Sequence, residues 1–220
     1  MVGLSLAVLS FVGSHELLSH PLRRPLVERL GEKGFLGLYS LVAFATFGWI
    51  IFEFRSAPDD LLWVAPVWAW TLGSVLMFVA SVLFVGSMTA PNPALAMAGG
   101  VLTTHPDPQA TLRLTRHPMM WSFAIWAAVH AGVSGRTAVV ILAAGIAVLA
   151  LFGAAMQDRK KRAALGERWA AWQAQTSFLP FATGRLWPGW IALVGGAILF
   201  LVATWAHPRL GAPIVGPWTY

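Results

Sequence analysis

Long apolar runs alternate with short polar segments along this chain. A transmembrane helix needs roughly 17–25 mainly apolar residues. The pattern predicts an all-α, polytopic transmembrane helix bundle that forms a single integral membrane domain over residues 1–220. Its six expected spans are about 2–19, 35–54, 62–88, 118–134, 137–156 and 187–206. The turn Ser134-Gly135-Arg136 is so short that the fourth and fifth spans are expected to be antiparallel neighbours.

Composition supports the membrane class. Hydrophobic residues make up 57% of the chain and charged residues only 11%, whereas a soluble domain carries about 25% charged residues. There are no cysteines, which excludes disulfides, zinc–thiolate sites and iron–sulfur clusters within the chain. The formal net charge of +6 reflects membrane orientation, and we expect no nucleic-acid partner.

Basic residues gather in the loops on one side of the predicted bundle. By the positive-inside rule this side is cytoplasmic, so both termini are predicted outside. The first span is expected to be retained, because a basic flank follows it where a signal peptide would carry a cleavage site. The basic loop residues are Arg23, Arg24, Arg29, Lys33, Arg113, Arg116, Arg159, Lys160, Lys161, Arg162, Arg168 and Arg185.

Two of the cytoplasmic loops are longer than plain connections need. Residues 89–117 are rich in Pro, Gly and Thr, and long loops of this kind are functional or disordered. Residues 157–184 begin as a basic helix with Trp169 and Trp172 on one side. This second loop predicts an interfacial amphipathic helix after the fifth span, lying in the headgroup plane.

Two of the six histidines, His15 and His130, fall within predicted spans. Ionisable groups inside a membrane are costly, face the bundle interior and often mark function. A neutral imidazole bonded to a neighbouring helix is an equal alternative for either residue alone. Two such histidines in a chain without cysteine favour a shared haem, whereas zinc would need further ligands.

The stretch Thr115-Arg116-His117-Pro118 begins the fourth span. Proline suits the first turn of a helix, and a helix N-terminus flanked by arginines is suited to an anion. Haem propionates, a cofactor phosphate or a lipid headgroup would fit Arg116 and His117. The alternative is simple orienting charge at a helix start, which is the better explanation for Arg113.

Three stretches together resemble a known family. FVGSHELLSHPLRRPLVERLGEKGFLGLYSLVA, LTRHPMMWSFAIWAAVHAG and ALGERWAAWQAQTSFLPF are similar to the NnrU family, of which the plant 15-cis-zeta-carotene isomerase is a distant relative. The resemblance implies a multi-pass protein of the bacterial inner membrane linked to nitrite and nitric oxide reduction in denitrification. It also implies haem b held by two histidines, which match His15 and His130.

One departure bears on the isomerase alternative. The plant enzyme has a cysteine three residues before its second histidine, where this chain has Ala127. A redox-linked ligand switch of the plant type cannot operate here. A carotenoid or isoprenoid isomerase, acting on a hydrophobic small molecule, therefore stays an alternative to a redox protein with both axial positions filled.

A second resemblance is to the isoprenylcysteine carboxyl methyltransferases. The pattern R-H-P-x-x-W, followed by G-E-x-W-x-x-W and L-P, matches Arg116, His117, Pro118, Glu167 and Trp172. It implies S-adenosylmethionine as the cofactor beside the membrane, and it ranks second. A third hypothesis is a non-enzymatic protein that helps to assemble or position a reductase complex.

The two predicted haem ligands differ in depth. His15 lies roughly 20 Å from the outer end of its span and His130 roughly 7 Å from the outer end of its own, at about 1.5 Å per residue. A pairing of His15 with His117 or His20 at the cytoplasmic side is the alternative. The resemblance favours the pair His15 and His130.

Overall fold

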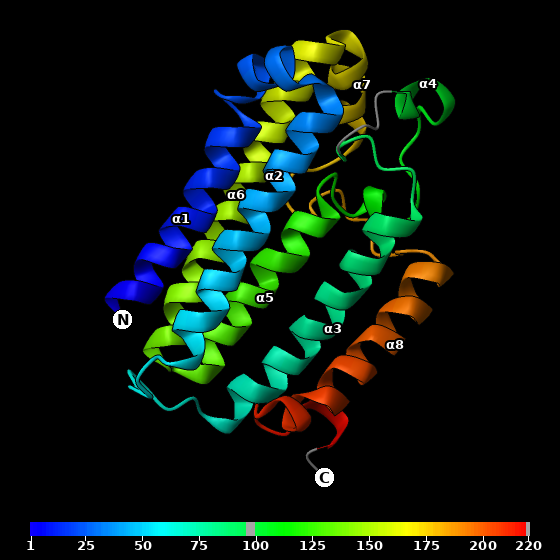
Figure 1. The fold of residues 1–220 in the computed structure, drawn as a ribbon. Helices are drawn as coiled ribbons and strands as arrows, with labels where there is room; N and C mark the ends of the chain where they lie inside the picture. The colour runs from blue at the N-terminus through cyan, green and yellow to red at the C-terminus, as the bar shows by residue number, and fades with distance from the viewer. Residues whose placement is uncertain (96–99, 219–220) are drawn as a thin grey trace. The chain divides into compact units, whose positions relative to one another are not determined.

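The computed structural model of the protein describes residues 1–95 and 100–218, and over these residues it contains helices and no strands. The predicted all-α class is confirmed. The helices are α1 (Val2–Ser19), α2 (Arg23–Arg55), α3 (Val67–Thr89), α4 (Val101–Thr104), α5 (Pro118–Ser134), α6 (Thr137–Leu165), α7 (Glu167–Gln175) and α8 (Trp190–Ala206) (Figure 1). Three short 3₁₀ turns join them: η1 (Ala110–Arg113), η2 (His207–Leu210) and η3 (Gly216–Trp218).

Within the described residues, five helices are long and apolar enough to cross a membrane, namely α1, α2, α3, α6 and α8 continued through η2. The fourth predicted span is present as α5, with the bounds expected from the sequence. Its 17 residues reach the lower end of the range that spans a bilayer. The chain is therefore a polytopic membrane protein with apolar helices suited to lipid contact.

Helix ends differ from the predicted span ends where polar residues continue a helix. The second helix begins at Arg23, twelve residues before the predicted 35, and bends at Gly31, whose φ is 72°. Two ion pairs support its polar part: Arg24 to Glu28 at 2.8 Å and Arg23 to Glu32 at 2.6 Å. Hydropathy marks the part of a helix that lipid covers, so it missed this charged extension.

Charged residues also extend α6, whereas Pro66 and Gly189 set the starts of α3 and α8. The fifth predicted span ended at 156, but α6 continues through its charged residues to Leu165. Within the predicted span 62–88, the third helix starts at Val67 after the extended N-cap Pro66, which confirms the proline as its expected start. The last starts at Trp190 rather than 187, after Gly189 at φ 88°.

By contacts the chain divides into two compact units, which are described separately. Unit 1 comprises Met1–Ala65 and His130–Leu149. In it α1 and α2 lie side by side (Figure 1). Its core contains Leu4, Ala7, Val8 and Ile50, together with Ala138 at the start of α6. The indole N–H of Trp63 donates to the Gly132 carbonyl at 2.9 Å and ties the loop after α2 to the end of α5.

Unit 2 comprises Pro66–Val129 and Ala150–Tyr220. In it α3 packs along α8 (Figure 1). Gly196 lies directly against the Val82 backbone, so a β-carbon at that position would overlap the neighbouring main chain. This close approach fixes the helix pair.

The amphipathic helix expected after the fifth span is present as α7. Its Trp169 and Trp172 are 0% and 1% exposed and pack against Ala94 and Leu112. The indole face of α7 is thus covered by the loop between α3 and α5, where the sequence suggested contact with headgroups. Part of that predicted long loop, residues 96–99, lies outside the described residues.

Candidate functional site

The most connected polar group of unit 2 is the carboxylate of Asp158, on the charged extension of α6. Arg116 donates to it from Nε at 2.8 Å and from one terminal nitrogen at 2.6 Å. His117 Nε2 lies 2.7 Å from its other oxygen. The sequence placed Arg116 and His117 together, and the structure adds the acid that binds both.

A second group of side chains completes the shell of this carboxylate. The Gln173 amide of α7 donates to Asp158 at 3.2 Å. Arg162 in turn donates to the Gln173 carbonyl oxygen at 2.7 Å, which fixes the amide so that its NH₂ faces the carboxylate. The cluster therefore joins the start of α5, the end of α6 and α7.

Backbone pairing holds the start of α5 in place. The Arg116 N–H donates to the Ser177 carbonyl at 2.9 Å. The Thr115 hydroxyl donates to the Phe178 carbonyl at 2.8 Å. The Trp121 indole N–H donates to the same carbonyl at 2.7 Å. The Phe178 ring packs on His117 at 5.4 Å between centroids and covers the cluster.

Burial makes this cluster electrostatically strong. The side chain of His117 is 0% exposed, that of Arg116 11% and that of Asp158 13%. Removing one partner of a buried ion pair costs about 3–5 kcal/mol, because the remaining charge is left uncompensated. With its Nε2 on Asp158 and its Nδ1 enclosed without a partner among the described residues, His117 is held as a structural group.

Asp158 was missed by sequence reasoning. It stands in the stretch QDRKKR, which was interpreted only as orienting positive charge. A signal was present, since Asp158 is the only acidic residue between Asp107 and Glu167. A lone carboxylate at the end of a span, in a chain with a basic pair at the start of another, predicts an ion pair.

His15 has a different environment, in unit 1. Its Nδ1 lies 2.7 Å from the Phe11 carbonyl one turn earlier in α1. Because a carbonyl only accepts, the proton of the neutral ring is on Nδ1, and Nε2 carries the lone pair. The rings of Phe11 and Tyr39 lie 4.2 Å and 5.3 Å from the imidazole. This arrangement is typical of a metal-ligating histidine, whose other nitrogen is usually oriented by a carbonyl.

The neighbouring acid pairs with another histidine. The Glu16 carboxylate lies 3.0 Å from His20 Nε2, one turn further along the chain. In the alternative pairing of His15 with His20, the Glu16 carboxylate would therefore compete with the iron for Nε2 of His20. The polar residues at this end of α1 are arranged along the helix itself.

The contacts of unit 1 allow the depths of His15 and His130 to be compared. Leu4 packs with Ala138, and Gly145 lies against Val8, so α1 and α6 run in the same direction. His15 is thus about seven residues beyond the level of Gly145, and the tight turn after α5 sets His130 about four residues short of it. The difference is about eleven residues, or roughly 16 Å, so the predicted pair stays a prediction.

A bare metal ion has little support in this chain. Among the described residues, no group of three or more His, Asp or Glu side chains is placed to hold one. A porphyrin supplies four nitrogen ligands itself, so the protein needs to provide only one or two axial ligands. The lone, oriented imidazole of His15 fits such a group better than it fits a free ion.

Comparison with known families agrees with this helical membrane architecture. The model of the family described as NnrU protein matches residues 3–214, nearly the whole chain. The chain belongs to the NnrU family. Searches of the curated proteins and of the solved structures give no significant match. The His15 helix and the Asp158 cluster both lie within the matched residues.

Proposed function

We propose that this NnrU protein binds haem b in the bacterial inner membrane, with His15 as an axial ligand, and serves redox or nitrogen-oxide metabolism in denitrification. The observation that supports the proposal is the 2.7 Å contact from His15 Nδ1 to the Phe11 carbonyl. It sets the tautomer in which Nε2 can bind iron.

The surroundings of His15 suit a porphyrin face. Phe11, Tyr39 and Phe47 form an aromatic group around or next to the imidazole, with Phe47 6.0 Å from Phe11. Apolar and aromatic side chains keep water from an iron centre and so tune its potential. Haem b held there would supply one-electron transfer, or gas binding where one axial position is open.

His130 is the proposed second ligand. It lies roughly 16 Å from His15 in depth, so a site that uses both histidines requires the helices to shift along one another. With both histidines on the iron, electron transfer or redox sensing is the function. With His15 alone, the open position suits a small gas such as nitric oxide.

The contacts of Arg116 and His117 favour haem over the methyltransferase alternative. Both residues are bound to Asp158, while Glu167 is exposed at the start of α7 and Trp172 is enclosed in a core cluster. Residues expected to line one open S-adenosylmethionine site thus have separate structural roles. The isomerase alternative shares the haem and would be distinguished by its product.

The proposal also includes a membrane orientation. The loops that carry most of the basic residues are placed in the cytoplasm and both termini outside. Cysteine substitutions at exposed Ser56 and Arg168, labelled from either side of intact cells, test this orientation in an otherwise cysteine-free chain.

An absorption spectrum of protein purified from haem-replete cells tests the function. We expect a Soret band that shifts on reduction, is lost in His15→Ala, and in His130→Ala changes from the form with two axial histidines to that with one. A colourless wild-type preparation would refute the proposal. An unchanged Soret band in His15→Ala would refute His15 as an axial ligand. An unchanged band in His130→Ala would show that His130 does not bind the iron and that one axial position is open.

A further inference from the structure

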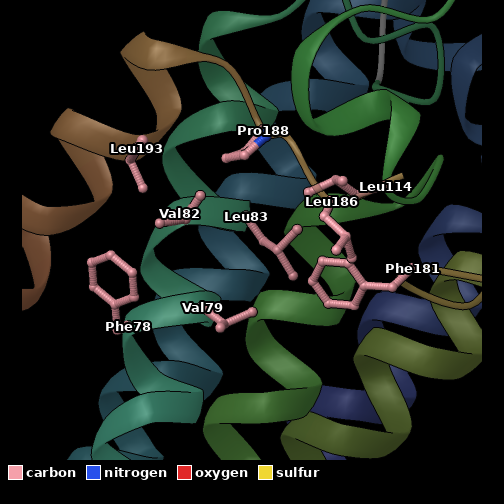
Figure 2. A pocket seen from close by; sticks show the side chains of 9 residues that line it. All are labelled: Phe78, Val79, Val82, Leu83, Leu114, Phe181, Leu186, Pro188 and Leu193. Carbon is pink, nitrogen blue, oxygen red and sulfur yellow. The ribbon is translucent and has the colours of Figure 1, made fainter. Parts of the chain in front are cut away.

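Unit 2 contains an apolar pocket that the proposed function does not use. It has a volume of about 170 Å³ and lies between α3, α8 and the segments at 114 and 181–188. Figure 2 shows Leu83, Leu114, Phe181 and Leu186 turned toward one another, with Val82 and Leu193 beside them. All nine lining side chains are hydrocarbon or aromatic, so the pocket suits an apolar group.

Two arginines adjoin this pocket in the sequence. Arg113 directly precedes Leu114, and Arg185 directly precedes Leu186. Their loops are tied together, because the Thr183 hydroxyl donates to the Arg113 carbonyl at 3.0 Å. The Phe181 N–H also donates to the Leu114 carbonyl at 2.9 Å. Each loop thus contributes one wall residue and one neighbouring guanidinium.

These guanidiniums are available to an anion. Both side chains are exposed, and within residues 1–95 and 100–218 neither has a carboxylate partner. Arg113 donates only from Nε, to the Pro108 carbonyl at 3.0 Å, so its terminal nitrogens are left over. Arg116, by contrast, is neutralised by Asp158.

The exposed residues near the pocket are those of a membrane interface. Trp187 and Trp190 are 51% and 70% exposed and meet edge to face at 4.8 Å. Tryptophan is enriched at the headgroup level of bilayers. Leu186, which lines the pocket, is itself 73% exposed, so a chain can enter from the lipid.

The backbone at Phe181 supports a built site. Its φ is 64°, a conformation that bulky residues rarely adopt and that surrounding structure must enforce. Here the hydrogen bond to Leu114 holds the strained residue, and the ring forms a wall of the pocket.

We infer that unit 2 binds one anionic glycerophospholipid, with an acyl chain in the apolar pocket and its phosphate between Arg113 and Arg185. The inference is independent of haem. The apolar pocket would hold the acyl chain, and the two guanidiniums would bind the negative headgroup. The exposed indoles mark the depth at which the glycerol lies.

Native mass spectrometry of delipidated, full-length protein tests the site, with phosphatidylglycerol and phosphatidylcholine of identical acyl chains as probes. We expect wild type to retain phosphatidylglycerol selectively. The double variant Arg113→Gln/Arg185→Gln should bind it roughly 30-fold more weakly, since each basic residue near an anionic headgroup contributes about fivefold. Arg209→Gln, which removes the guanidinium that stacks on Trp205, is the matched control and should change nothing.

A second pair of variants tests the acyl chain. Val79→Phe fills the pocket and should weaken both lipids, whereas Val75→Phe, one turn earlier and outside the lining, should weaken neither. Equal retention of the two lipids by wild type would overturn the inference. So would unchanged phosphatidylglycerol binding in the double variant, or displacement of lipid by equimolar glycerol phosphate, which has no chain.

Discussion

His15 and His117 are both helix-borne histidines of one membrane protein, yet their nitrogens are used in opposite ways. His15 is partly exposed, and its Nδ1 contact with Phe11 leaves Nε2 open. His117 is fully enclosed, with Nε2 on Asp158. The two residues differ in which ring nitrogen remains available, and only His15 keeps one that could bind a ligand.

The two regions also differ in what they contribute to folding. Around Asp158, side chains from three helices meet in a single ionic cluster. Around His15 the contacts are aromatic and within or next to the helix. Substitutions should therefore separate stability, supported by the Asp158 cluster, from the haem binding proposed for His15.

The largest expected effect is on haem content. His15→Ala should lower the haem per folded protein more than about tenfold, because it removes the proposed axial ligand. His117→Gln should keep its haem, since His117 binds Asp158. The measurement is a pyridine haemochrome assay on matched monodisperse samples. Equal losses of haem in the two variants would contradict the different roles of His15 and His117.

The next effect is on stability. Asp158→Ala should lower the free energy of unfolding by about 3–5 kcal/mol, because the Arg116 guanidinium keeps its buried charge without a partner. Chemical unfolding in detergent measures it. Asp107→Ala, an exposed acid, is the control and should stay within about 0.5 kcal/mol of wild type.

A sharper form of the same test removes the whole cluster. Replacing Arg116, His117 and Asp158 together by apolar residues of similar size should recover part of the lost stability, as buried ion pairs replaced this way often do. A triple variant less stable than Asp158→Ala would show that the cluster does more than balance charge.

A smaller effect is expected at the support of the cluster. Thr115 is fully buried and its hydroxyl donates to the Phe178 carbonyl. Thr115→Val should cost about 0.5–1.5 kcal/mol, the net contribution of one hydrogen bond, because the Phe178 carbonyl still accepts from the Trp121 indole. Thr183→Val, whose exposed hydroxyl meets one carbonyl, should cost less in the same unfolding assay, and the opposite order would contradict the importance of burial.

The smallest effect tests an ion pair outside both regions. Arg24 and Glu28 are 90% and 61% exposed in α2, so Glu28→Gln should cost about 0.3–0.5 kcal/mol. Added salt should abolish this difference while leaving the Asp158→Ala effect, since buried pairs are screened less. Unfolding at low and high ionic strength gives both numbers.

The membrane fold was predictable because lipid imposes a simple requirement on sequence. The bounds of α1 and α5 agree with the predicted spans, since polar or turn residues stand where those helices end. The helical part of α2 before residue 35 was not predictable from hydropathy, because it is rich in charged residues such as Arg23 and Glu32, which form an exposed ion pair.

The candidate site was predictable only in part. Arg116 and His117 were found from their place at a helix start, but Asp158 is distant in sequence and carries no motif. Its role depends on how α6 passes the start of α5 within unit 2, which spacing alone cannot give. The tautomer of His15 likewise needed the Phe11 contact.

Phe181 shows what a backbone at φ 64° says about a position. Glycine would adopt that conformation without cost, and yet the chain keeps a benzyl group there. Relaxing the main chain with Phe181→Gly would remove a wall of the pocket at the same time. At this one residue, a relaxed backbone and a closed pocket therefore exclude each other. A substitution here can relieve the backbone strain or keep the pocket wall, but not both.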